Sequence, residues 1–238
     1  MLSLLAAAGR RNLAGRLWLV PADGRRSFPE LADAELAALC PAPLADRQWA
    51  EAAEAWAGFA APDPRALDAF SRRGLDPGRL GHGRADRGPA GLEPAIHALG
   101  VSTQGDRGLA LPFLGAAMRR HLRDLPWTTD GLAETERLVL LALRATGTTE
   151  EAALLRALRA ADPVFHPTDL ILRDVLRRLR AGPQPLATED GPTEHGLAVL
   201  EGRRRHRPSP RAQGGVAVLP DPPWLWDPER GGVVAGRS

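Results

Sequence analysis

The sequence predicts a mainly α-helical protein with a small β component, arranged in three parts. Amphipathic helical patterns dominate, a stretch rich in Gly, Arg and Pro interrupts them, and short apolar runs typical of strands gather near the C-terminus. A chain of 238 residues, of which 44% are hydrophobic, can bury a core in one or two domains. We expect an N-terminal part over residues 1–70, a linker or insertion over 71–108, and a winged-helix-like domain with a terminal β-hairpin over 109–238.

The N-terminal part combines one short strand with helices. Residues 2–8 are typical of a helix end, and residues 16–20 predict a buried strand that has no obvious partner strand. Leucines between residues 31 and 39 share one helical face. A further helix is predicted over residues 44–59, where Trp and Ala recur at helical spacing.

Residues 71–108 differ in character, because Gly, Arg and Asp are frequent there and hydrophobic periodicity is lost. We expect this segment to be a flexible, Gly/Arg/Pro-rich linker or insertion. Order returns at Leu111, where an amphipathic helix begins that ends before Pro126.

The C-terminal part predicts three consecutive helices, near residues 132–145, 148–161 and 168–181. Thr168 is the expected N-cap of the third helix, which Gly182 ends. Strand signals and one short helix follow, at residues 185–188, 215–219, 224–226 and 233–234 for the strands and 193–200 for the helix. Three helices followed by strands is the element order of a winged helix-turn-helix.

The composition limits which partners, metals and cofactors we expect. The net charge is only +2 and every basic residue is Arg, so the overall charge gives little support for a polyanion partner. Cys40 is the only cysteine, and the six histidines lack metal-ligand spacing, so we expect no disulfide, no structural metal and no cofactor. No apolar run approaches the roughly 20 residues of a membrane span. We therefore expect a cytoplasmic protein with no membrane partner.

One arginine cluster lies on the third predicted helix of the C-terminal part. Arg173, Arg177 and Arg180 form one stripe, which a recognition helix would turn toward DNA. The apolar residues opposite the stripe are Ile171, Leu172, Val175, Leu176 and Leu179. The alternative is a solvated face on which Asp169 and Asp174 pair with these arginines.

A second arginine cluster follows the short predicted helix and contains no acidic residue. Its members are Arg203, Arg204, Arg205 and Arg207. Such a segment can follow a phosphate backbone as the basic wing of a winged helix. The alternative is an irregular loop, because Pro208 and Pro210 oppose regular structure.

The remaining candidate residues favour structural roles. Glu134 and Glu136 point to different sides of a helix, which argues against a paired acid–base site and favours interaction with the helix dipole. Cys40 has no histidine nearby in the sequence that would activate it as a nucleophile. Trp224 and Trp226 face the same side of a strand, where packing against helices is favoured over a ligand platform.

Five segments, in this order and spacing, resemble the bacterial family catalogued as domain of unknown function 1835, with its C-terminal companion region. They are AEAWAGFAAPDPRAL (53–67), ALPFLGAAMRRHLRDLP (110–126), GLAETERLVLLAL (131–143), TEHGLAVLEG (193–202) and GGVAVLPDPPWLWD (214–227). Family members begin with an α/β region that holds a His-x-x-x-Gly-Asp-Ser-like segment and a later Asp-Gln-Leu, and neither occurs here. The resemblance implies that residues 1–20 are a partial α/β remnant of an N-terminally truncated sheet domain.

The leading functional expectation is a regulatory or nucleic-acid-binding module without enzymatic activity. One alternative is the truncated remnant of an enzyme whose site lay in a missing N-terminal α/β domain. Another is a protein-interaction adaptor that uses the winged helix without DNA. The sequence assigns no catalytic residue, so the partner is expected to be DNA or another protein.

Overall fold

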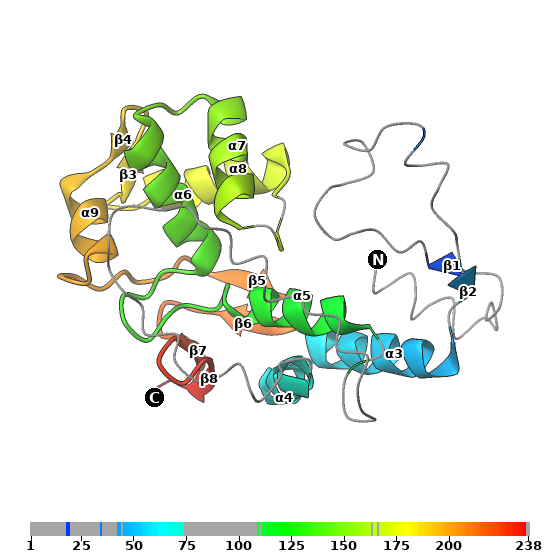
Figure 1. Ribbon diagram of the computed structural model, residues 1–238. Coiled ribbons are helices and arrows are strands. Elements are labelled where there is room, and N and C mark those ends of the chain that lie inside the picture. Colours follow the sequence, from blue (N-terminus) through cyan, green and yellow to red (C-terminus); the bar gives the residue numbers. More distant parts are fainter. Residues whose placement is uncertain are drawn as a thin grey trace. The chain divides into compact units, whose positions relative to one another are not determined.

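The structure, a computed structural model, describes residues 18–19, 34, 42–43, 45–73, 109, 111–162, 164–165 and 167–236. The chain divides into two compact units, residues 1–57 with 72–115 and residues 58–71 with 116–238. Helices predominate over short antiparallel strand pairs, which confirms the predicted mainly α class with a small β component (Figure 1). No described helix is long and apolar enough to cross a membrane.

The first unit contains the strand that was predicted near residues 16–20. It is β1 (Trp18–Leu19), and it pairs antiparallel with β2 (Ala42–Pro43). The expectation that this strand lacks a partner is therefore wrong. An Ala-Pro dipeptide carries no alternating apolar pattern, so no local signal indicates β2, although proline is tolerated in an edge strand. The helices predicted at 2–8 and 31–39 lie outside the described residues, except that Ala34 is helical.

Three helices precede the C-terminal elements, namely α3 (Asp46–Ala60), α4 (Arg65–Arg73) and α5 (Pro112–Leu122). The predictions of α3 and of α5 are confirmed. The helix α4 was not predicted. It directly follows Pro64, a residue whose missing N–H is harmless at a helix start.

The extent of α4 corrects the start of the predicted linker. Residues 71–73 belong to this helix, and the side chain of Ser71 is fully buried. Its hydroxyl donates a hydrogen bond to the carbonyl oxygen of Asp68 at 2.8 Å. Residues 74–108 lie outside the described residues, so the linker over the rest of this segment stays a prediction.

The second unit is built on a cluster of three helices, α6 (Glu134–Thr146), α7 (Glu151–Ala161) and α8 (Asp169–Arg180). Figure 1 shows them side by side, and each contacts the other two. They bury one apolar core, whose largest members include Leu132, Leu140, Leu143, Leu154, Leu172 and Leu179. All three predicted helices are confirmed, and each begins one to three residues later than expected.

Local sequence explains where these helices begin. The carboxylate of Glu136 accepts a hydrogen bond from the backbone N–H of Ala133 at 3.0 Å, and Asp124 accepts one from the N–H of Thr135 at 2.8 Å. Both carboxylates therefore stabilise the N-terminus of α6, as the helix-dipole interpretation of Glu136 predicted. The hydroxyl of Thr168 accepts from the N–H of Ile171, which confirms the predicted N-cap of α8.

Short hairpins and one helix complete the second unit. The elements are β3 (Ala187–Thr188), β4 (Gly191–Pro192), α9 (Glu194–Leu200), β5 (Arg211–Gln213), β6 (Val216–Val218), β7 (Trp224–Asp227) and β8 (Gly232–Ala235). The strands pair antiparallel as β3–β4, β5–β6 and β7–β8. The sequence predicted β3, β6, β7, β8 and α9. It did not predict β4 and β5, because their polar, Gly and Pro residues carry no strand pattern.

The two tryptophans of β7 pack against arginines of the preceding helices. The guanidinium of Arg65 lies 5.2 Å from the ring centre of Trp224, and that of Arg119 lies 5.3 Å from the ring centre of Trp226. These distances are typical of cation–π contacts. The packing role expected for Trp224 and Trp226 matches these contacts with α4 and α5.

Candidate anion-binding pocket

In the arginine stripe of α8, Arg173 and Arg177 are exposed and paired with acids, whereas Arg180 is half-buried and its Nε atom is shielded from solvent. Arg173 lies 3.0 Å from Glu151 of α7 and 3.5 Å from Asp169, and its side chain is 62% exposed. Arg177 lies 2.5 Å from Asp174. The ion pairs expected for a solvated face are therefore present, and they neutralise much of the positive charge of the stripe.

The opposite face of α8 differs from the prediction at its N-terminal end. Leu172, Val175, Leu176 and Leu179 are buried as expected. Ile171 lies opposite the arginine stripe as predicted, but it is 38% exposed, and the preceding Leu170 is 69% exposed. The first turn of α8 lies beyond the edge of the core, and its apolar side chains remain accessible.

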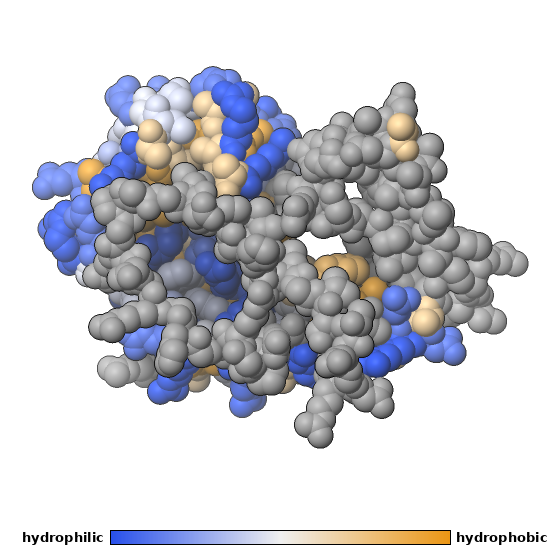
Figure 2. Space-filling model, in the orientation of Figure 1, coloured by the Kyte–Doolittle hydropathy of each residue, from blue (hydrophilic) through white to orange (hydrophobic). Residues whose placement is uncertain are grey.

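The second arginine cluster lies in an irregular segment between α9 and β5, as the loop interpretation predicted. In Figure 2, hydrophilic side chains cover the edge where Figure 1 places α9 and the segment after it. Arg203 pairs with Glu201 at 2.5 Å and Arg207 pairs with Asp221 at 2.6 Å. Arg204 and Arg205 are exposed, and neither has an ion pair with any described residue.

Backbone contacts hold this segment against the loop before α6. The N–H of His206 donates to the carbonyl oxygen of Asp130 at 2.6 Å. The next residue in that loop, Gly131, has a φ of +78°, and a Cβ atom there would lie 2.1 Å from the carbonyl oxygen of His206. Only glycine permits so close an approach at this backbone angle. The position of Arg205, next to His206, is thereby fixed at the backbone.

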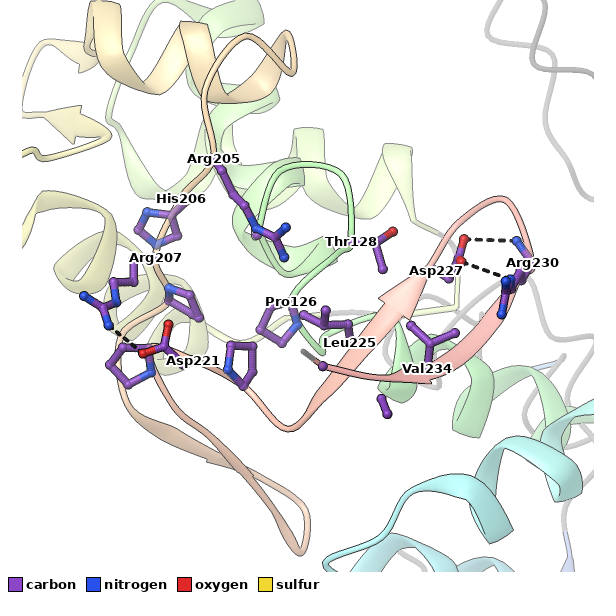
Figure 3. A pocket seen from close by; sticks show the side chains of 16 residues that line it. Pro126, Thr128, Arg205, His206, Arg207, Asp221, Leu225, Asp227, Arg230 and Val234 are labelled. Atoms are coloured by element: carbon purple, nitrogen blue, oxygen red, sulfur yellow. Dashed lines mark hydrogen bonds and ion pairs between the residues drawn. The ribbon is translucent and has the colours of Figure 1, made fainter. Parts of the chain in front are cut away.

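A pocket of about 740 Å³ opens beside this segment (Figure 3). Its apolar surface comes from Leu225, Val234 and several prolines, namely Pro126, Pro208, Pro220 and Pro222. Figure 3 shows the side chain of Arg205 extending over the pocket, between His206 and Thr128. The volume lies within the roughly 300–1,000 Å³ range of small-molecule sites.

The charges around the pocket leave one cation unpaired among the described residues. Arg207 is paired with Asp221, and Arg230 lies 3.5 Å from Asp227. Arg205 has no such partner in the described part of the chain, so its guanidinium offers all its donors to a ligand. A guanidinium binds phosphate or carboxylate through two parallel hydrogen bonds, and this pocket can therefore bind an anion.

Two largely buried histidines make stability depend on pH. Burial lowers the pKa of His206, assisted by the charge of Arg211 and His195 and opposed by Glu136. Burial likewise lowers the pKa of His121, assisted by Arg120 and opposed by Asp124. Both rings are therefore held neutral in the folded state at pH 7.

Acidification below about pH 6.5 is expected to lower the melting temperature. In the unfolded state these histidines bind protons near the ordinary pKa of 6.5, whereas in the folded state they bind protons only at lower pH. The protein therefore has its full stability above pH 6.5. It is lost as the pH falls toward the lower folded values. Thermal melts across this range should show a flatter pH dependence for His206→Gln than for the wild type. Parallel curves for the two proteins would contradict this expectation.

A network of buried charges lies between α5, α6 and α8. Arg120 forms ion pairs with Asp162 and, at 3.0 Å, with Asp124, and it donates to the hydroxyl of Thr135 at 2.9 Å. Beside it, Glu136 lies 3.3 Å from Arg178 and 3.6 Å from Arg211. The i,i+4 spacing of Arg120 and Asp124 was visible in the sequence, whereas the long-range partners were not.

Among the described residues, no group of three or more His, Cys, Asp or Glu side chains could hold a metal ion. Cys40 lies outside the described residues. Arg205 and Arg207 were candidates from the sequence, and both line the pocket. Asp221, Asp227 and Arg230 were not, because isolated charges in the tail carry no signal of spatial convergence.

No protein-family model matches the chain, and neither a curated protein nor a solved structure matches it. The resemblance to domain of unknown function 1835 therefore stays a prediction. Fold and site together define a mainly helical protein with a basic surface segment beside an open pocket.

Proposed function

We propose that the second unit is a nucleic-acid-binding module of winged-helix type, and that residues 203–207 make its main contact with the phosphate backbone. The observation that carries the proposal is the pair of exposed arginines, Arg204 and Arg205, which have no ion pair within the described residues. A guanidinium group without an ion pair can bind phosphate directly, because no bond to a carboxylate has to be broken first. Arg205 also lines a pocket, which adds a concave surface to the charge.

The arrangement of α6, α7, α8 and the β3–β4 hairpin supports the winged-helix assignment. Three packed helices are followed directly by a two-stranded hairpin, in the order of a winged helix. The turn of this hairpin is acidic, however, since it holds Glu189 and Asp190. Like charges repel phosphate, so this hairpin is unsuited to contact the backbone.

The two arginine clusters differ in how readily they can bind phosphate. The stripe of α8 contacts DNA only if Arg173 and Arg177 exchange their carboxylate partners for phosphates. Arg204 and Arg205 need no such exchange. We therefore assign the larger share of the electrostatic binding energy to the segment and the smaller share to α8.

The double variant Arg204→Ala/Arg205→Ala is expected to bind duplex DNA about tenfold more weakly at low salt, because phosphate contacts dominate nonspecific affinity. Its log–log slope of affinity against salt should fall by about 0.9 for each phosphate that the variant no longer neutralises. The matched control, Arg173→Ala/Arg177→Ala, removes the same charge and should change both quantities less. Fluorescence anisotropy at several salt concentrations measures them.

Two results would contradict this proposal. Negligible binding of duplex and single-stranded DNA by the wild type at low salt would remove the nucleic-acid function. A larger decrease in affinity for the α8 variant than for the segment variant would move the DNA-binding surface to α8.

A protein-interaction adaptor is the second candidate function, and exposed apolar side chains favour it. Val164, Leu170 and Ile171 line a second pocket of about 550 Å³ beside the charge network, and they are 44%, 69% and 38% exposed. Clustered apolar exposure is typical of protein contact surfaces. If the wild type binds neither duplex nor single-stranded DNA, the adaptor becomes the favoured function.

A further inference from the structure

The pocket beside residues 205–208 has one feature that binding of a phosphate group alone does not need. About half of its lining surface is apolar, and Pro126 and Leu225 face the space over which Arg205 extends (Figure 3). A phosphate group alone is fully hydrophilic and gains nothing from such a surface. The pocket therefore fits a ligand that carries an anionic group next to a flat apolar ring.

We infer that this pocket takes one unpaired nucleotide of a nucleic-acid strand, with its phosphate on Arg205 and its base against the proline-lined surface. The inference rests on the proposed function and specifies its substrate class. Unpaired bases can leave the stack and enter a pocket, whereas paired bases in a duplex are held inside the helix. The module should therefore prefer single strands over duplexes.

Other groups around the pocket agree with this occupant. The imidazole of His206 lies beside Arg205 in Figure 3, and histidine is among the side chains on which bases stack. Burial lowers the pKa of this ring and keeps it neutral at pH 7, so it has no counter-ion requirement. On the other side, the Thr128 hydroxyl is a further donor for the phosphate or sugar. Asp221 and Asp227 occupy the rim but are already bound to Arg207 and Arg230.

The adjacent arginines supply a matched pair of variants. Arg204 and Arg205 are both exposed and carry the same charge, but only Arg205 lines the pocket. Removal of Arg204 weakens the general attraction to any nucleic acid. Removal of Arg205 weakens that attraction and also takes away the anchor of the pocket. The two variants therefore separate charge from pocket occupation.

The experiment compares a fluorescent oligothymidylate with a duplex of equal phosphate number, titrated into the full chain. The wild type should bind the single strand about tenfold more tightly, since one stacked base contributes roughly 1–3 kcal/mol. Arg205→Ala should abolish this preference. Arg204→Ala should weaken both complexes and keep the preference. Melting temperatures of the variants verify that each is folded.

The outcomes separate this inference from the proposed function. Equal affinity of the wild type for both probes, or a preference that survives Arg205→Ala in the folded variant, would overturn the inference and leave a nucleic-acid-binding module. Failure of both probes to bind would overturn the inference together with the proposed function. A preference that disappears in Arg205→Ala and persists in Arg204→Ala would support the inference.

Discussion

Replacing Arg120 with Ala is expected to lower the free energy of unfolding by about 3–5 kcal/mol, the range for a broken buried ion pair. Its side chain is only 5% exposed, and the side chains of Asp124 and Asp162 are 15% and 11% exposed. Burial opposes the charge of Arg120, but the attraction of both carboxylates outweighs it and raises the pKa of the guanidinium. Its removal leaves two carboxylates in low dielectric without their counter-ion.

Denaturant titration of Arg120→Ala and of the control Arg173→Ala measures this effect. Arg173 also pairs with two acids, but its side chain is 62% exposed, so solvent replaces the missing partner and the change should be far smaller. A double-mutant cycle with Asp162→Ala isolates the pair and should give a coupling of roughly 0.5–3 kcal/mol. Equal destabilisation in the two single variants would show that the network contributes nothing beyond a surface pair.

The second large effect is expected in the core of the three-helix cluster. Leu140→Ala should lower the free energy of unfolding by about 2–5 kcal/mol, because it removes buried methyl groups and leaves a cavity. Leu140 is completely buried between α6, α7 and α8. The neighbouring Leu141 is 42% exposed on the same helix, and Leu141→Ala is the matched control.

The control makes the same chemical change at the same helix propensity, so the difference between the variants measures burial alone. Leu141→Ala should change stability by well under about 1 kcal/mol, as is usual for surface sites. Thermal or urea unfolding distinguishes the two outcomes. If Leu141→Ala were as destabilising as Leu140→Ala, the orientation of α6 would be wrong.

Helices with strong periodicity could be predicted from the sequence. The apolar spacing in α3, α6, α7 and α8 defines one buried face each, and a threonine cap or a glycine marks several ends. These signals are local, because a helix forms its hydrogen bonds within itself. The strands β6, β7 and β8 could be predicted too, because each is a short apolar run next to turn residues.

Short strands with weak patterns could not be predicted, because their partners decide them. Neither β2 nor β4 contains an apolar run: β2 pairs with the distant strand β1, and β4 pairs with β3 across a two-residue turn. Helix α4 was missed for a different reason, because Pro62 and Pro64 were interpreted only as the end of α3. Its own signal is local, since Leu67 and Phe70 lie three residues apart on one buried face directly after Pro64.

The candidate site also has one part that could be predicted from the sequence and one part that could not. The sequence by itself determined the helical class and the arginine-rich segment, since composition and periodicity are properties of neighbouring residues. The tertiary structure alone decided that Arg205 extends over a pocket whose other walls come from 126–131 and 220–236, while Arg173 and Arg177 meet acids. Residues that are distant in the sequence come together only when helices and strands pack. No local sequence pattern therefore determines which arginine forms an ion pair and which remains available to a ligand.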